Sequence, residues 1–281
     1  MVFFSKIVAA VFAWGAYVVL RLAGWKRKTV MANAKHVASP VNYDELLKNL
    51  TRHASELLFC FGIFKKLPRD FAAYPCCVDG WTFDIAEGSV PVLEKMCKGG
   101  IFLTAHYGNY EAMGPWLCRL GIPLVASYIP VKPKWLNNIL ERKIRAVGGR
   151  SYSVDARTPR DFLRILDDGK LFCLLADQDS RISSAIDGTF LGRPANVNPL
   201  PDFLLKHRPQ TPVYICWMEE KNGVRELHAI EVTSPAPFLQ SSVVIMPFNK
   251  WLEQRIVENP NLWYSFTHRR FFSRSPEIYG G

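Results

Sequence analysis

The 281-residue chain is 49% hydrophobic and 21% charged, a globular composition with enough length for one large core or two small ones. Its formal net charge of +10 predicts an acidic partner, such as nucleic acid, an acidic protein or an anionic membrane surface. Nucleic acid is disfavoured, because the Lys and Arg residues are scattered and no RNA-recognition or zinc-finger signature is present. The seven cysteines form no C-x-x-C pair, and we expect buried, reduced thiols.

The first expected element is an apolar helix over residues 2–25, in which Lys6 and Arg21 are the only charged residues. Its uncharged part, Ile7–Leu20, is short for a full membrane span, which needs about 20 residues. The basic cluster Lys26–Lys28 follows, so the positive-inside rule predicts that the rest of the chain is cytoplasmic. A signal peptide would carry its charges before the apolar run, and we therefore predict an uncleaved membrane anchor. Whether it spans the bilayer or lies in one leaflet stays open.

We expect an anchor with its basic flank at residues 1–28 and a catalytic domain at residues 29–281. A helix capped near Asn42 should end before Pro68. Short apolar runs then alternate with helical ones, which predicts an α/β fold with a mostly parallel central sheet flanked by helices. The expected strands are 101–105, 123–129, 151–155, 170–176, 211–218 and 224–233. The expected helices among them are one that ends at Leu120, then 134–147, 158–169 with Thr158 as its cap, 200–207 and 246–259.

The segment TAHYGNYEAMG, residues 104–114, follows the first of these strands and carries one histidine and one glutamate. On a continuous helix, His106 and Glu111 would lie about 140° apart, because each residue advances about 100°. We therefore predict a strand that ends at His106, a turn at Gly108 and a helix from near Asn109, which brings the Glu111 carboxylate back toward the imidazole. The simpler alternative is a histidine at a sheet edge and a glutamate in a first helical turn.

Two more polar residues, Asp177 and Gln178, follow the apolar strand LFCLLA. Functional sites in open α/β sheets lie beyond the carboxyl ends of the strands. Because His106 also follows a strand, the two strand ends predict one site at the same edge of the sheet.

The sequence lacks several common catalytic motifs: a G-x-S-x-G elbow, both glycine-rich nucleotide loops and H-E-x-x-H. The six histidines are dispersed, so we expect no metal site, and we expect no cofactor. What remains is a histidine–glutamate pair without a protein nucleophile, which suits a general base that activates a hydroxyl or amine of the substrate. In this scheme Glu111 holds the imidazole of His106 and stabilises its cation. The predicted reaction is acyl transfer between two bound substrates.

Five short blocks occur in a definite order along the chain. They are HYGNYE (106–111), Arg142 before AVGG, the pair Asp177-Gln178, FLGRPA (190–195) and WYSFTHRRF (263–271). Together they resemble the late acyltransferases of lipid A biosynthesis, within the glycerolipid acyltransferase superfamily, in which a strand ends in H-[FY]-G-N-[WY]-E. The resemblance covers nearly the whole chain, including the N-terminal anchor.

This resemblance implies an enzyme that moves a fatty acyl chain from a thioester on acyl carrier protein or coenzyme A to a hydroxyl of a membrane glycolipid, such as a lipid A precursor. It implies a bacterial inner-membrane protein whose catalytic domain is on the cytoplasmic face. The net charge of +10 suits acidic acyl carrier protein and an anionic membrane equally. The alternatives are a lysophospholipid or mannoside acyltransferase with the same fold, or a non-catalytic lipid-binding protein.

By the same resemblance the catalytic residues are His106 and Glu111. The candidate substrate-binding residues are Arg142, Asp177, Gln178 and Arg193, although Arg142 is equally a solvated helix charge and Asp177 equally a turn residue. A role in substrate binding or structure is implied for the His268–Arg270 segment. Three apolar residues after the histidine have the spacing to line an acyl channel, with ordinary core packing as the alternative; they are Met113, Trp116 and Leu117.

Overall fold

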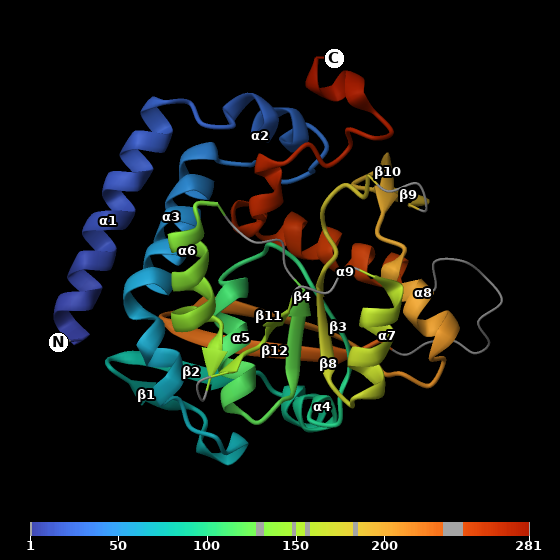
Figure 1. Ribbon diagram of the computed structural model, residues 1–281. Helices are drawn as coiled ribbons and strands as arrows, with labels where there is room; N and C mark the ends of the chain where they lie inside the picture. Colours follow the sequence, from blue (N-terminus) through green and yellow to red (C-terminus); the bar gives the residue numbers. More distant parts are fainter. Residues whose placement is uncertain are drawn as a thin grey trace.

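The computed structural model describes residues 2–127, 132–147, 150–154, 158–181, 185–232 and 244–280. In these ranges a central sheet has the strand order β1-β2-β12-β11-β3-β8-β4-β7 and is flanked by helices (Figure 1). The strands of this sheet are β1 (Cys76–Val78), β2 (Trp81–Ile85), β3 (Gly100–Thr104), β4 (Leu124–Ser127), β7 (Ser153–Val154), β8 (Leu171–Leu175), β11 (Val213–Lys221) and β12 (Val224–Glu231). Two separate hairpins pair β5 (Ala146–Val147) with β6 (Arg150–Ser151) and β9 (Ile186–Phe190) with β10 (Arg193–Val197).

The sheet is mostly parallel, as the sequence predicts. Parallel pairing joins β2 to β12 and runs from β11 through β3, β8 and β4 to β7, whereas β1–β2 and β11–β12 are antiparallel. All five residues of β3 are buried, as expected of a parallel strand covered on both faces. Ile101 and Leu103 contribute to the core on one face, and Phe102 contributes to the core on the other.

Seven of the nine α-helices in the described residues overlap a predicted helix. The nine are α1 (Val2–Leu22), α2 (Arg27–Ala34), α3 (Tyr43–Cys60), α4 (Ser89–Met96), α5 (Tyr110–Arg119), α6 (Lys134–Ile139), α7 (Pro159–Asp167), α8 (Leu200–His207) and α9 (Ile245–Glu258). Of these, α2 and α4 were not predicted. Asn42 caps α3 by accepting from the first-turn amides, and Thr158 forms a capping box with Asp161 at the start of α7. These two caps confirm the helix starts expected from the sequence.

The expected helix over residues 134–147 is shorter in the structure. The α-helix α6 ends at Ile139 and continues as a π-helical turn, Leu140–Ile144. The amide of Arg145 donates to the carbonyl of Leu140, a π-type bond that turns the chain before β5. The expected terminator, Gly148-Gly149, lies outside the described residues. The π turn matters for the site, because Arg145 is the residue that leaves it.

The block FLGRPA forms the turn of the β9–β10 hairpin, which the sequence analysis did not predict as strands. Leu191 and Gly192 both have positive φ, 49° and 70°, as a two-residue type I′ turn requires. Phe190 is fully buried and packs on the core. The glycine of this block therefore serves the hairpin.

The prediction of buried thiols holds for only part of the cysteines. All seven are free, and Cys60 and Cys216 are buried. Cys77 and Cys97 are exposed, which differs from that prediction.

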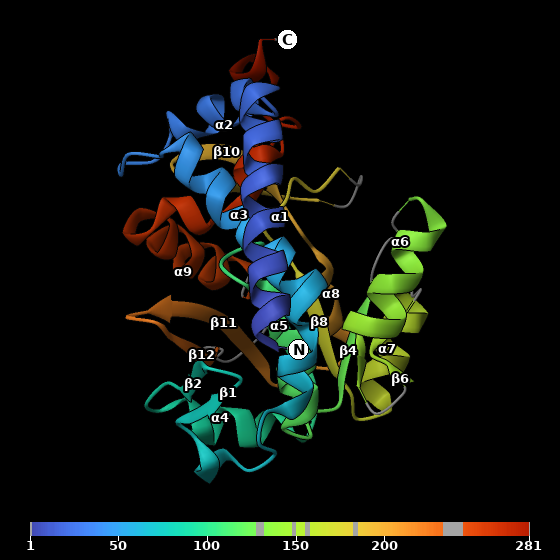
Figure 2. The same ribbon diagram turned by 90° about the vertical axis from the view of Figure 1, so that its left-hand side faces the viewer.

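The N-terminal helix α1 lies beside α3 on one side of the molecule (Figures 1 and 2). By length and composition its segment Phe4–Leu22 is able to cross a membrane, and little of it is buried. The next helix, α2, reaches the C-terminal part of the chain: buried Asn33 donates to the carbonyls of Phe266 (2.8 Å) and His268 (2.7 Å). The division at residue 28 stays a prediction.

Candidate active site

The predicted strand, turn and helix around His106 are present. β3 ends at Thr104, the chain turns through residues 106–109, and α5 begins at Tyr110. Gly108 has φ +58°, and a Cβ there would lie 2.5 Å from the carbonyl oxygen of Met218. Only glycine fits this turn, which fixes the histidine at the carboxyl edge of the sheet.

The imidazole of His106 is held by Asp177, which follows the neighbouring strand. β3 and β8 are parallel and paired, with Thr104 opposite Leu175, so their carboxyl ends meet at one edge. His106 Nδ1 lies 2.8 Å from Asp177 Oδ1, and the His106 amide donates to Asp177 Oδ2 at 3.1 Å. The strand-end prediction therefore brings these two residues together correctly.

Asp177 is fully buried, and the C-terminal segment supplies its remaining donors. Trp263 Nε1 donates to Oδ2 at 2.9 Å, and Ser265 Oγ donates to the same oxygen at 2.7 Å. The backbone of this segment also bonds to the turn that carries the histidine, because the Tyr264 amide donates to the His106 carbonyl at 2.8 Å. Residues far apart in sequence thus fix one carboxylate.

The charges and hydrogen bonds around this pair keep Asp177 ionised and favour the protonated form of His106. Burial alone would raise the pKa of the Asp177 carboxyl, but the charge of His106 and the bonds from His106, Ser265 and Trp263 hold that pKa well below its usual range. Burial would lower the pKa of His106, but the charge and hydrogen bond of Asp177 and the charge of Glu111 raise it above its usual value. An ionised carboxylate only accepts, so Nδ1 of His106 carries its proton and Nε2 is the basic atom.

The neighbours of the other ring nitrogen, Nε2 of His106, are polar and aromatic side chains. Gln178 Nε2 lies 3.5 Å away. The ring of Tyr110 packs edge-on at 5.0 Å between centroids, and the ring of His268 lies at 6.3 Å. A substrate hydroxyl that reaches Nε2 would have Gln178 beside it.

Glu111 is placed differently from the prediction. Its Oε1 pairs with Arg145 Nη2 at 2.8 Å, and the hydrogen bond expected from Glu111 to the imidazole is made by Asp177 instead. The reason is geometric: Glu111 lies in the first turn of α5, whereas Nδ1 of His106 faces the end of β8. The carboxylate of Glu111 still acts on His106 through its charge.

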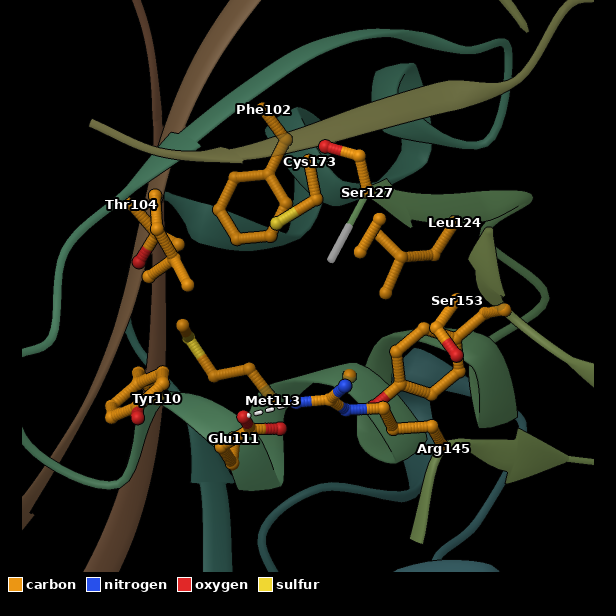
Figure 3. A pocket seen from close by; sticks show the side chains of 14 residues that line it. Phe102, Thr104, Tyr110, Glu111, Met113, Leu124, Ser127, Arg145, Ser153 and Cys173 are labelled. Atoms are coloured by element: carbon orange, nitrogen blue, oxygen red, sulfur yellow. Dashed lines mark hydrogen bonds and ion pairs between the residues drawn. The ribbon is translucent and has the colours of Figure 1, made fainter. Parts of the chain in front are cut away.

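An apolar pocket, partly open to solvent, has Tyr110 and Glu111 among its lining residues. Figure 3 shows Met113, Phe102 and Leu124 around the cavity, with the Glu111–Arg145 ion pair on one side. Its lining residues are Phe102, Thr104, Tyr110, Glu111, Met113, Gly114, Leu124, Ala126, Ser127, Arg145, Tyr152, Ser153, Cys173 and Leu175. Such a pocket fits an aliphatic chain better than a polar ligand.

Of the three residues predicted to line an acyl channel, only one lines this pocket. Met113 lines it, whereas Trp116 and Leu117 are fully buried and are not among its lining residues. Trp116 instead packs against the ring of Phe83 and donates to the hydroxyl of Tyr74 at 2.9 Å. Burial raises the pKa of the lining thiol, Cys173, so it stays protonated and is no nucleophile at neutral pH.

Two of the predicted substrate-binding residues, Arg142 and Arg193, make no contact with His106 among the contacts of the described residues. Arg142 is exposed on the π-helical turn, and Arg145, three residues later, is the arginine that reaches the pocket. Arg193 is exposed on the β9–β10 hairpin, where its Nε contacts His36 Nδ1 at 3.2 Å. Gln178 and Asp177, by contrast, both contact His106.

Sequence reasoning missed Arg145, Trp263 and Ser265. The last two lie in the block WYSFTHRRF, whose presence was noticed without a role for either residue. Arg145 gave no separate signal, because it reaches Glu111 only through the π turn. In the same block, Arg270 is fully buried, stacks on Phe190 and donates to a backbone carbonyl, which indicates a structural role.

Metal binding finds no support among the residues that the structure describes, since no three His, Cys, Asp or Glu side chains there are grouped to hold an ion. The fold and the site are those of an α/β enzyme with a histidine–carboxylate pair beside an apolar pocket, joined through Tyr110, which packs on His106 and lines the pocket.

A family model described as bacterial lipid A biosynthesis acyltransferase matches residues 91–273, and the chain belongs to this family. The resemblance drawn from the five blocks is thereby confirmed. No curated protein matches the sequence. The protein is an acyltransferase of lipid A and lipopolysaccharide biosynthesis, which takes an acyl donor and a lipid acceptor. The matched range contains His106, Asp177 and Trp263, and it begins after α1.

Proposed function

We propose that the enzyme transfers a fatty acyl chain from a thioester, on acyl carrier protein or coenzyme A, to a hydroxyl of a membrane glycolipid such as a lipid A precursor. The observation that carries this proposal is the pairing of His106 with the buried Asp177 beside the apolar pocket, since Tyr110 both packs on the His106 ring and lines the pocket. The pocket accommodates the acyl chain, and the basic Nε2 atom activates the acceptor hydroxyl.

In the proposed reaction, Nε2 of His106 takes the hydroxyl proton while that oxygen attacks the thioester carbonyl. The new C–O bond forms, and the imidazolium is stabilised by the ionised Asp177. The tetrahedral intermediate then breaks its C–S bond, and the thiolate leaves with the proton from Nε2. Gln178, 3.5 Å from Nε2, helps to position the acceptor hydroxyl.

Glu111 supports the reaction in a second way. Its charge raises the pKa of His106, and its ion pair holds Arg145 on the wall of the pocket. We assign to Arg145 a contact with the polar end of a bound substrate. Arg142 and Arg193, both exposed, stay candidates for binding anionic groups of a substrate outside the pocket.

Membrane association at the inner membrane, with the catalytic domain in the cytoplasm, completes the proposal. The apolar helix α1, its basic flank at residues 26–28 and the net charge of +10 support it.

The test is an acyl-transfer assay with purified protein in detergent, an acyl thioester and either a lipid A precursor or a lysophospholipid. Products are identified by mass spectrometry. We expect transfer to the lipid A precursor, lost in His106→Ala and kept in His207→Ala, which changes an exposed histidine of α8. Transfer to the lysophospholipid alone would reassign the acceptor. Thioester that is never consumed would indicate a lipid-binding protein instead.

A further inference from the structure

The N-terminal helix α1 is docked on α3 along its length. The ring of Phe12 packs against Phe59 with 5.2 Å between centroids, and Lys48 Nζ lies 5.4 Å from the ring of Tyr17. As residue numbers rise along α1, those of its partners on α3 fall, so the helices are antiparallel. Figure 1 shows the two helices side by side, and in Figure 2 α1 lies in front of α3.

Both charged residues of α1 contact the domain. Near the N-terminal end, Lys6 Nζ lies 5.1 Å from the ring of Trp81. Near the other end, Arg21 Nε pairs with Asp44 Oδ1 at 2.9 Å. Both charges of α1 are therefore paired with groups of the domain.

The side of α1 that faces away from α3 carries an exposed apolar stripe. Its members follow each other at spacings of three, four or eight residues, which places them on one face of a helix. They are 46–78% exposed: Phe4, Ile7, Val11, Trp14 and Leu22. The stripe therefore runs the whole length of the helix.

A transmembrane orientation conflicts with this docking. A helix of 19 residues is about 28 Å long, so α1 would need to stand nearly upright to cross a core of about 30 Å. Its neighbour α3 would then lie at the same depth, with exposed Glu45 and Lys48 in hydrocarbon. An orientation parallel to the membrane keeps these charges in water.

Positive charge marks the end of the stripe. Lys26, Arg27 and Lys28 follow α1 directly and are all exposed. Basic residues beside an apolar helical face are attracted to anionic lipid headgroups. The occupant that fits both the stripe and its flank is the surface of an anionic bilayer.

We propose that α1 is an in-plane membrane helix, which inserts its stripe into one leaflet while it stays docked on α3. The inference rests on the proposed membrane association and adds its geometry. The apolar face enters the headgroup and acyl boundary by about 5–10 Å. Both chain ends then lie on the same side of the membrane.

The first test uses the full-length protein with one epitope tag at each end, in inside-out and right-side-out inner-membrane vesicles. Protease should remove both tags from inside-out vesicles and neither from right-side-out vesicles. Tags on opposite faces would overturn the proposal, since α1 would then cross the bilayer. This readout does not depend on acyl transfer, so it fails or succeeds separately from the detergent assay of the proposed function.

The second test measures partition of the protein onto vesicles of phosphatidylglycerol and phosphatidylethanolamine. The double variant Val11→Glu, Trp14→Glu should bind at least tenfold more weakly than the wild type. The matched control, Ile230→Glu, changes a 40%-exposed residue of β12 and should bind as the wild type does. Circular dichroism checks that each variant folds. The proposal would be overturned if the double variant bound vesicles as tightly as the wild type does. If the double variant also formed a smaller oligomer than the wild type, the stripe would be an interface between copies of the chain.

Discussion

Two carboxylates lie near the imidazole of His106, and their surroundings are opposite. Asp177 is fully buried and accepts from four donors. The Glu111 side chain is 24% exposed, lies on the pocket wall and pairs with one cation, Arg145. The buried carboxylate is fixed by the fold and orients the imidazole of His106. The other lies on the pocket wall, where it pairs with Arg145 and its charge raises the pKa of His106.

The comparison predicts that Asp177→Asn has the largest effect. The amide keeps the size but loses the charge and fixes the wrong tautomer, so transfer should fall by about 10²–10⁴. The matched control is Asp167→Asn, at an exposed ion pair with Arg208. If the rate of the variant stayed within a few-fold of the wild-type rate, Glu111 and not Asp177 would be the residue that orients the imidazole of His106.

The same variant predicts a change in pH dependence. Only the neutral imidazole accepts a proton, so the wild-type rate rises with pH through the raised pKa of His106. Without the Asp177 charge that pKa falls, and the rising limb of the residual rate should move to lower pH. A pH–rate profile of kcat/KM measures this; an unmoved limb would contradict the pairing.

Glu111→Gln should have the next largest effect. It removes a weaker influence on the pKa of His106 and releases Arg145, so we expect a loss of about tenfold and a smaller downward shift of the pH limb. Kinetics should also show a raised KM, because Arg145 is no longer held on the pocket wall. A loss as deep as in Asp177→Asn would make the two carboxylates equivalent and break the comparison.

Met113→Trp tests whether the Glu111 side is the substrate side. Each methylene is worth about 0.8 kcal/mol on burial, so filling the pocket should shift preference toward shorter donors by roughly fourfold per methylene excluded. A competition among donors of several lengths, with products resolved by mass, measures the shift. Equal loss for all lengths would show that Met113 only packs in the core.

Ser265→Ala should have the smallest effect, because Asp177 keeps its other donors. We expect a loss of about 1 kcal/mol in the free energy of unfolding and less than a tenfold loss in kcat, with KM unchanged. Ser273→Ala, which removes a donor to Asp179, is the matched control. A change in KM without a change in kcat would place Ser265 on the substrate side.

Local patterns predicted most of the long elements of the fold because their signals are local, but they did not predict β1, β2, α2 or α4. The caps at Asn42 and Thr158 and the alternation of strands and helices depend on neighbours in sequence. The hairpin of β9 and β10 was missed, since a short polar strand such as IDGTF has no strong apolar period. The π turn before Arg145 was missed as well, because helical spacing does not register a single changed hydrogen bond.

The sequence predicted which residues lie at the site better than it predicted which of them pair with each other. His106 and Asp177 were both found as polar residues at strand ends, but the sequence analysis paired His106 with Glu111, its neighbour along the chain. Which strands lie side by side is a property of the whole sheet, and the β3–β8 pairing decides the matter. Trp263 and Ser265 reach Asp177 only through the return of the C-terminal segment, which no spacing rule reports.

That return has a consequence for synthesis of the protein. α1 is made first, whereas Trp263 and Ser265, two of the donors to Asp177, lie near the end of the 281-residue chain. Because chains emerge from the amino end, the helix proposed to reach the membrane is available before the base is held in place. If both proposals hold, a nascent or prematurely ended chain reaches the membrane before Trp263 and Ser265 fix Asp177 beside His106.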